Sequence, residues 1–429
     1  MLSSIKQKKI SSTRKRLLSN FFSLSSIQMA SYILPMITIP YLVRTLGVEK
    51  FGLIAFAQAM IQYFVIFTDY GFGLSATKEI AENRDNLKKL EEIFSAVMVI
   101  KILFIILSFM LLSILVLSFD QFHKEWKLYY LTFGIVVGQA LFPVWFFQGI
   151  EKMHITALIN ILPKIFFTLS IFFIIKNESD YIYVPLINSL GFLLAGIVSL
   201  WLAFDKFNAH FSIPSKMQII YQIKEGWHIF LGTISSNLAM LNITFILGIL
   251  TNPTMVGYYA AVEKIIRPIS SLVRPVINAI FPHLVKISKS NPQHAIRFSK
   301  KVAFFISAIM FIIGVLLFLF SDALVRFLFG EAFNASSIIL KIMAFIPMLR
   351  ALIEVNAVLN LIVFNFKEFY SKVLFVGFTM SLFSSFVAIK FFEVNGAALA
   401  NIITDSIILI IILIYLKIHL NIKEIHLND

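Results

Sequence analysis

Residues 306–320 read ISAIMFIIGVLLFLF, and residues 407–415 read IILIIILIY. Neither stretch contains a charged residue, and neither alternates between polar and apolar side chains as a strand of a transmembrane β-barrel would. Unbroken apolar runs are typical of helices that cross a bilayer, which need about 20 apolar residues each. The sequence therefore predicts an all-α protein that lies in a membrane.

The composition extends this interpretation to the whole chain of 429 residues. Hydrophobic residues make up 59% of it, charged residues only 14%, and the mean hydropathy is +0.87, which does not suit a water-soluble surface. At about 35 residues for each span with its connection, the length provides for about twelve helices and leaves no room for a large soluble catalytic domain. The predicted spans are 17–45, 50–78, 91–118, 126–149, 154–176, 181–204, 219–250, 255–285, 298–321, 335–364, 368–390 and 395–417.

Three polar breaks separate the apolar stretches, at residues 78–92, 205–216 and 286–301, and none is long enough for an enzyme domain. The middle break divides the chain into an N-terminal lobe (1–205), a cytoplasmic linker (206–217) and a C-terminal lobe (218–429) that ends in a short cytoplasmic tail. Each lobe has six spans. Sliding the second half back by 205 residues places VGYYAAVEK over FGLIAFAQA and Gly257 over Gly52, which suggests a parallel repeat.

The orientation follows from the basic residues of the loops, because Lys and Arg are retained on the cytoplasmic side during insertion. With the N-terminus inside, 23 basic residues lie in cytoplasmic segments and 7 on the opposite side. Both termini are therefore expected in the cytoplasm. The basic start KQKKISSTRKR (6–16) precedes nearly thirty residues without a cleavage site, which predicts a retained first span rather than a signal peptide.

Seven of the 37 basic residues fall inside the predicted spans, where a charge near a helix centre costs about 2.5–3.5 kcal/mol and is usually kept for function. They are Lys101, Lys164, Lys264, Arg267, Arg274, Lys341 and Arg350. The four acidic residues at depth are Asp69, Glu263, Glu354 and Asp405, so seven minus four leaves an excess of +3. Lys341 is close enough to a span end to reach the interface, and two i,i+4 pairs, Arg350 with Glu354 and Arg267 with Glu263, are open as simple neutral pairs. A cationic interior suits an anionic substrate.

The eighth predicted span concentrates these charges. Its polar side chains recur at intervals of three and four and share one helical stripe: Lys264, Arg267, Ser271, Arg274 and Asn278. Its prolines recur every seven residues, at 268, 275 and 282, and should bend the helix. This pattern predicts the bent wall of a substrate pathway; ordinary proline kinking with charges paired to neighbouring helices is the alternative.

The stretch from Ile33 to Asp85, with PYLVRTLG (40–47) and TDYGF (68–72), resembles the polysaccharide biosynthesis family of Wzx-type O-antigen repeat-unit flippases. The likeness continues at 145–164, 256–276 and 365–378. This resemblance implies a MATE-like fold of two six-helix lobes around a central cavity, in the multidrug/oligosaccharidyl-lipid/polysaccharide exporter (MOP) superfamily. It also implies that the protein moves an oligosaccharide on undecaprenyl pyrophosphate, for O-antigen of lipopolysaccharide or a related surface polysaccharide, across the bacterial inner membrane by alternating access.

The resemblance also implies site residues. The basic positions that recur in the family are matched here by Arg44, Lys101, Lys164, Lys264 and Arg267, and its TDYG element by Asp69; Arg274 stands where family members often lack a basic residue. We expect these six basic residues to bind substrate and Asp69 or Glu263 to couple transport to an ion. The expected partners are the lipid-linked oligosaccharide, the bilayer, and a polysaccharide polymerase with a chain-length regulator, without nucleic acid.

Other function classes are less well supported. The sequence has no Cys, no H-E-x-x-H pair and no Walker-type glycine loop, so we expect neither an enzyme nor a cofactor, and transport would draw on an H⁺ or Na⁺ gradient or on substrate supply. A multidrug and ion antiporter is the main alternative, although exporters of cationic drugs should carry an excess of interior carboxylates. A membrane enzyme would need a larger external segment.

The topology can be tested by cysteine labelling. Single Cys residues introduced within 79–90, 206–217 and 286–297 of this Cys-free chain should resist membrane-impermeant thiol reagents in intact cells, because these segments carry the cytoplasmic basic residues. Labelling of those loops from outside would overturn the orientation.

Overall fold

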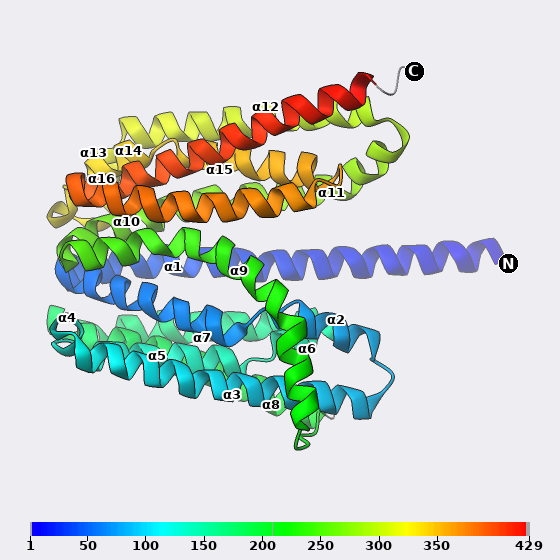
Figure 1. Ribbon diagram of the computed structural model, residues 1–429, viewed down its shortest axis with the longest axis horizontal. Helices are drawn as coiled ribbons and strands as arrows, with labels where there is room; N and C mark the ends of the chain where they lie inside the picture. Colours follow the sequence, from blue (N-terminus) through cyan, green and yellow to red (C-terminus); the bar gives the residue numbers. More distant parts are fainter. Residues whose placement is uncertain (1, 208, 426–429) are drawn as a thin grey trace. The chain divides into compact units, whose positions relative to one another are not determined.

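The computed structural model describes residues 2–207 and 209–425, and the side chains of residues 34–207, 209–227, 229–231 and 242–419. Over these residues the regular elements are helices and none is a strand, which confirms the all-α prediction (Figure 1). The last residues of the predicted cytoplasmic tail, 426–429, lie outside the described residues.

The chain folds as two compact units. The first contains Met1–Thr45 and Ile61–Leu231, and the second contains Leu46–Met60 and Gly232–Asp429. These units differ from the predicted lobes in two segments, because residues 46–60 pack with the second unit and residues 218–231 with the first. The lobe boundary at 206–217 stays a prediction.

In the first unit, α5 packs along α8, α8 also packs along α7, and α3 lies beside α5 (Figure 1). Small residues allow the close approach of α5 to α8: a Cβ atom on Gly138 would lie 2.4 Å from the backbone carbonyl carbon of Phe192. The helices of this unit are parts of α1 (Leu2–Asp69) and α9 (Lys216–Leu250), with α2 (Ser75–Glu82), α3 (Leu87–Ser118), α4 (Asp120–His123), α5 (Trp126–Leu141), α6 (Val144–Gly149), α7 (Met153–Ile174), η1 (Glu178–Ile182) and α8 (Tyr183–Phe207).

In the second unit, α12 packs along α15 and α11, while α16 contacts α10, α14, α15 and η3. The segment η3 is a π-helix. This form is rare in proteins, and where it occurs it is often found at functional sites. Besides its parts of α1 and α9, this unit contains α10 (Pro253–Ser271), α11 (Val273–Ser290), α12 (Pro292–Leu319), α13 (Ser321–Phe329), η2 (Glu331–Phe333), α14 (Ser336–Met343), α15 (Ile346–Val355), η3 (Asn356–Ile362) and α16 (Lys367–Ile425).

Three of the long helical segments are interrupted. Helix α1 is kinked at Gly47, where φ is +71°, a value that glycine adopts without strain. Helix α16 is kinked at Glu393, and its two halves run back along each other, since the rings of Phe369 and Tyr415 stack at 3.5 Å between centroids. The eighth predicted span breaks at Leu272, which separates α10 from α11, so its predicted bend is present.

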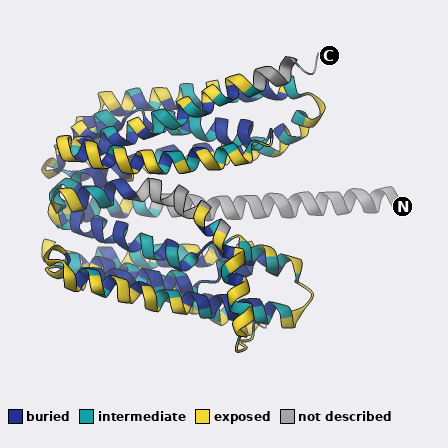
Figure 2. Cartoon of the chain, in the orientation of Figure 1, coloured by how far each residue is buried: buried dark blue, intermediate teal, exposed yellow. Residues whose placement is uncertain are grey.

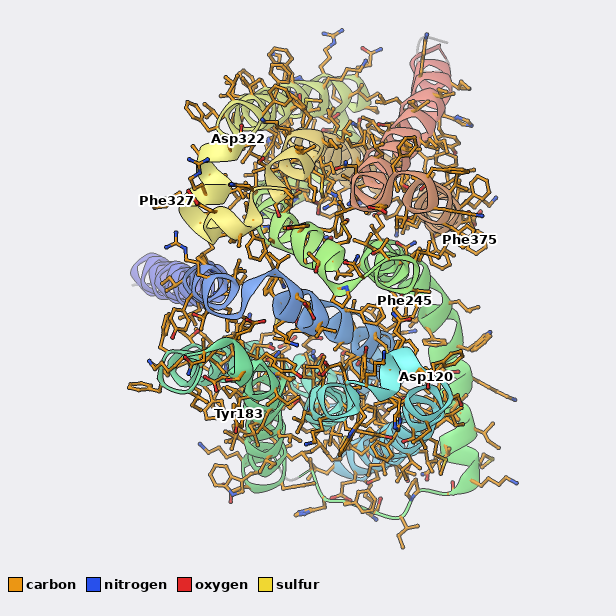
Figure 3. The ribbon with its side chains drawn as sticks, turned by 90° about the vertical axis from the view of Figure 1, so that its left-hand side faces the viewer. Asp120, Tyr183, Phe245, Asp322, Phe327 and Phe375 are labelled. Carbon is orange, nitrogen blue, oxygen red and sulfur yellow. The ribbon has the colours of Figure 1, made fainter. Side chains whose placement is uncertain are left out.

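Seven helical segments are long and apolar enough to cross a membrane in the part of the chain that the structure describes. The segments Leu34–Asp69 and Lys367–His419 each contain a kink and cover two predicted spans, whereas α10 carries Glu263, Lys264 and Arg267 and is not among the seven. The total of twelve spans stays a prediction. Exposed residues line the outer surfaces of the helices (Figure 2), and the exposed side chains of Phe327 and Phe375 point outward in Figure 3.

The two glycines that the 205-residue offset superimposes meet in the second unit. A Cβ atom on Gly52 would lie 1.8 Å from the carbonyl oxygen of Pro253 and 2.7 Å from the amide nitrogen of Gly257. A Cβ atom on Gly257 would lie 2.2 Å from the carbonyl oxygen of Val48. Only residues without a side chain allow α1 and α10 to approach so closely. The matching glycines therefore have a packing role at a shared helix contact.

Candidate anion site in the second unit

A pocket of about 360 Å³ lies within the second unit, between α10, α11, α15, η3 and α16. Its wall holds three arginines and three carboxylates: Glu263, Arg267, Arg274, Arg350, Glu354 and Asp405. Three of these six, Glu263, Arg267 and Arg274, are predicted site residues, and the fold brings them together with three charges from helices later in the chain.

Glu263 and Arg267 form the first of three ion pairs in this pocket. The Arg267 Nε and Nη2 atoms donate to the same Glu263 oxygen, Oε1, at 3.1 and 2.9 Å. The hydroxyl of Thr244 donates to the other oxygen at 3.3 Å. The pair joins residues one helical turn apart on α10, as the sequence analysis left open. Because the Arg267 side chain is 43% exposed and Glu263 only 11%, the guanidinium is the accessible member.

Arg350 and Asp405 form the second pair, and both are largely buried, with 20% and 14% of their side chains exposed. Arg350 Nε donates to Asp405 at 3.0 Å, and its Nη2 donates to Asn401 at 2.8 Å. The Asn401 amide then donates to the buried hydroxyl of Tyr259 at 2.7 Å. This chain of bonds ties α15 to α16 and α10, so Arg350 is held in place from several sides.

Arg274 and Glu354 form the third pair, with 2.8 Å between Arg274 Nε and Glu354 Oε1. The interpretation of Arg350 and Glu354 as partners of each other is therefore wrong, because Glu354 pairs with α11 and Arg350 with α16. Arg274 is the most accessible of the three arginines, with 64% of its side chain exposed.

The three pairs neutralise the pocket, because three arginines minus three carboxylates leave no net charge. The sum of the charges over all predicted spans indicates a cationic cavity, because it does not show how the charges are distributed. In this pocket positive charge is present but each arginine already has one partner. An anion that enters would therefore meet arginines that already share their charge with a carboxylate, rather than free cations.

In the first unit, two predicted residues with different expected roles contact each other. Lys101 Nζ lies 3.1 Å from Asp69 Oδ1, and the lysine side chain is 3% exposed against 49% for the aspartate. Lys101 is thus oriented by a carboxylate. Arg44 is exposed and Lys164 half-buried in the same unit, and Lys164 forms no ion pair with a described carboxylate.

The remaining predicted positions lie outside the pocket wall. Lys264, next to Glu263 on α10, is exposed and does not line the pocket. Lys341 donates at 2.7 Å to Asp322 on α13, which Figure 3 labels, so it is paired at an exposed position, as expected of a residue near a span end. Among the described residues, no group of three His, Asp or Glu side chains could hold a metal ion.

Sequence comparison decides the family. The profile of the family described as polysaccharide biosynthesis protein matches residues 17–288. The chain belongs to this polysaccharide biosynthesis protein family. One relative, named "Putative O-antigen transporter" in Escherichia coli (strain K12), is 30% identical over 398 residues, which are 93% of this chain and 96% of that protein.

Solved structures show the same fold for this member of the polysaccharide biosynthesis protein family. The lipid II flippase MurJ in an inward closed conformation matches with a TM-score of 0.72 at 15% identity, over 92% of this chain and 87% of that chain. An inward-facing multidrug resistance MATE family transporter of the MOP superfamily also matches with a TM-score of 0.72, at 11% identity over 90% of this chain and 94% of that chain. The predicted MATE-like fold is confirmed.

The family match includes α10 and most of α11 but ends before the helices that supply the other half of the pocket. Sequence reasoning found Arg350 and Asp405 as charges at depth without a role, and it missed Thr244, Tyr259 and Asn401. Asn401 and Asp405 lie one turn apart on α16, so their common direction was readable. Their shared partner on α15, Arg350, could not be predicted from the sequence, because tertiary packing brings it to them.

In this family member the buried pair of Arg350 and Asp405 should contribute more to the free energy of unfolding than the exposed pair of Lys341 and Asp322. Asp405→Ala should lower the free energy of unfolding by about 3–5 kcal/mol, because it leaves Arg350 buried without its carboxylate. The double variant Arg350→Leu, Asp405→Leu should recover most of this loss. Unfolding in mixed micelles with a rising fraction of sodium dodecyl sulfate, followed by far-ultraviolet circular dichroism, provides the measurement.

The matched control is Lys341→Ala, which removes the pair with Asp322 and should cost less than about 1 kcal/mol because both side chains are exposed. Equal losses for Asp405→Ala and Lys341→Ala would contradict a structural role of the buried pair.

Proposed function

We propose that this protein is a flippase that moves undecaprenyl-pyrophosphate-linked oligosaccharide repeat units, of O-antigen or a related surface polysaccharide, from the cytoplasmic to the periplasmic leaflet of the bacterial inner membrane by alternating access. The observation that supports it most directly is the pocket with three arginines in a helical membrane protein of the polysaccharide biosynthesis protein family. The names of the relatives agree with this proposal, since one refers to O-antigen transport and a fold neighbour is a lipid II flippase. Both termini lie in the cytoplasm in this proposal.

The geometry of the arginines suits a diphosphate. A guanidinium is planar and can donate two parallel hydrogen bonds to phosphate oxygens, as it does to carboxylates. Arg267 and Arg274 are accessible enough to exchange a carboxylate for a phosphate. Arg350, on α15, is bound to Asp405 on α16 and stabilises the pocket wall. A pocket of about 360 Å³ has room for the diphosphate but not for an oligosaccharide, so the sugars must lie elsewhere. Lys264, Lys101, Lys164 and Arg44 are the further contacts of this proposal.

Multidrug export remains the second function class, and no observation favours it here. The likeness to a MATE transporter at 11% identity concerns the fold alone. The pocket has as many arginines as carboxylates, so it offers a cation no excess of negative charge.

In this proposal an ion gradient or the membrane potential drives transport. Moving a group with about two negative charges out of an inside-negative cell is favoured by about 2.3 kcal/mol per charge per 100 mV. Asp69 and Glu263 are the coupling groups, because each is paired with a cation that also serves the substrate. A polysaccharide polymerase and a chain-length regulator are the partners that would receive the product.

The substrate role of Arg267 can be tested in cells that have this protein as their flippase. Arg267→Ala should abolish surface polysaccharide while the protein still inserts, since a main donor to the diphosphate is lost. Arg267→Lys should keep part of the activity if charge matters more than the planar fork. Polysaccharide is measured by gel electrophoresis of surface extracts, and expression by immunoblot.

A purely structural Arg267 would behave differently. In that case Glu263→Gln combined with Arg267→Ala should restore transport, because the carboxylate no longer needs a partner. Full transport by a Lys264→Ala, Arg267→Ala double variant at normal expression would refute the proposed site.

The coupling role has its own measurement. In vesicles with imposed pH or Na⁺ gradients, Glu263→Gln and Asp69→Asn should each reduce the dependence of transport on the gradient, because neither side chain can then bind a proton or exchange its charge. Unchanged gradient dependence in both variants would remove these carboxylates from the mechanism.

A further inference from the structure

One end of the second unit carries a concentration of basic side chains that the proposed transport mechanism does not use. They come from the end of α11, the start of α12, the start of α16 and a later turn of α16. We call them the basic rim, and it consists of Lys286, Lys289, Arg297, Lys300, Lys301, Lys367, Lys372 and Lys417. All eight are exposed.

The fold brings these four segments together. The rings of His283 and Phe298 lie 5.9 Å apart between α11 and α12, and Phe369 stacks on Tyr415 between the two halves of α16. Two adjoining clefts of about 680 and 660 Å³ share Asn365 and Lys367; the first also contains Lys289. The rim is therefore one surface with hollows rather than a set of scattered lysines.

The charge of the rim is unmatched. Within residues 283–301, 367–372 and 415–419 the only acidic residue is Glu368, so eight basic residues minus one acidic residue leave +7. None of the eight forms an ion pair with a carboxylate in the described part of the chain. Like charges at this density repel one another, so an anionic ligand would stabilise them.

The need to fix membrane topology does not explain this excess. Insertion responds to Lys and Arg, and Asp and Glu contribute little, so a loop can retain its orientation while its net charge is near zero. The first unit has such a loop: residues 78–92 contain four basic and five acidic residues. There Lys78 pairs with Glu82, Lys89 with Glu92, and Arg84 with Glu151. Residues 78–92 and the basic rim both satisfy the positive-inside rule. Of the two, the basic rim is the one whose positive charge is not balanced by acidic residues.

The depth of the rim indicates what kind of anion it meets. In α12 the apolar part from Val302 to Leu319 is about 27 Å long, which matches the hydrocarbon thickness of a bilayer. Lys300 and Lys301 directly precede it, and Phe304 and Phe305, one turn later, are 69% and 64% exposed. In the same way Lys372 directly precedes an apolar run that includes the exposed Phe375. The basic groups therefore stand at the level of lipid head groups, beside side chains that face the acyl chains.

We propose that the basic rim is a binding surface for anionic phospholipids of the surrounding leaflet, whose head-group phosphates occupy the clefts around Lys289 and Lys367. An acidic protein would not require exposed aromatic side chains one turn away from the cations. Clusters of four to eight Lys and Arg at a membrane surface attract anionic lipid additively, and salt screens the attraction. The surface is separate from the pocket that is lined by Arg267 and Arg274, since none of its residues lines that pocket.

The experiment uses purified full-length protein in phosphatidylcholine vesicles without lipid-linked oligosaccharide. Trace spin-labelled phosphatidylglycerol or phosphatidylcholine reports the fraction of lipid that the protein immobilises. The wild type should prefer phosphatidylglycerol, and the preference should decrease in 1 M salt. The variant Lys289→Gln, Lys300→Gln, Lys367→Gln should lower the preference ratio by about threefold or more.

The matched control is Lys78→Gln, Lys88→Gln, Lys89→Gln, which removes the same charge from the balanced loop and should leave the ratio nearly unchanged. Equal melting temperatures of both variants and the wild type show that the fold is retained. No preference for phosphatidylglycerol in the wild type, an equal decrease in the two variants, or a preference that persists in 1 M salt would each overturn the proposal. None of these readouts depends on transport, so the flippase function can fail while the lipid surface stands, and the reverse.

Discussion

The cost of placing an ionised side chain away from water is the constraint on which the interior of this protein depends. Inside a helical membrane protein a charge has to be matched by a neighbour or by a ligand. Among the residues that the structure describes, four pairs satisfy this condition: Lys101 with Asp69, Arg267 with Glu263, Arg274 with Glu354 and Arg350 with Asp405. Three of the four connect different helices, so the same interactions that neutralise the charges also fix the rotation of those helices.

Helix interruptions make room for the charged pocket. Arg267 on α10 and Arg274 on α11 stand on either side of the break at Leu272, and both line the same pocket. On the facing side the π-helix η3 follows Glu354, and its Asn356 and Asn360 bond to each other at 3.0 Å, while Asn360 also accepts from Ser299 on α12. These bonds satisfy the buried side-chain amides of Asn356 and Asn360, and the Asn356 amide also donates to the backbone carbonyl of Leu352 at 2.8 Å. The pocket is thus built from local departures from α-helical geometry.

The fold class was readable from the sequence because hydropathy alone identifies membrane helices, and the bend near Leu272 was readable from its prolines. The correspondence of Gly52 with Gly257 suggested only a repeat, and the contact between these two glycines was not predicted, because tertiary packing sets it. The pairing of Arg350 and Glu354 was wrong for a physical reason. Spacing along a helix shows which side chains are neighbours on that helix, but a stronger partner on another helix, such as Asp405, is set by tertiary packing. For the same reason the near-cancellation of charge in the pocket could not be predicted from a sum over the interior.

A site that is already neutral behaves differently from a free cationic cavity. A free cluster of cations would hold a diphosphate tightly and release it slowly, whereas an arginine that exchanges one anionic partner for another loses little free energy in either direction. A phosphate that takes Arg267 would leave Glu263 without its ion-pair partner, and among the described residues the hydroxyl of Thr244 would still donate to it. The abandoned carboxylate then has to bind a proton or a metal cation, or move toward water. In the proposed mechanism, exchange at this neutral pair would couple the arrival of an anion to the uptake of a cation through the same two side chains. The accessible arginines, Arg267 and Arg274, can take part in such an exchange, while the buried Arg350 is fixed by Asp405 and Asn401 and keeps the frame in which it occurs.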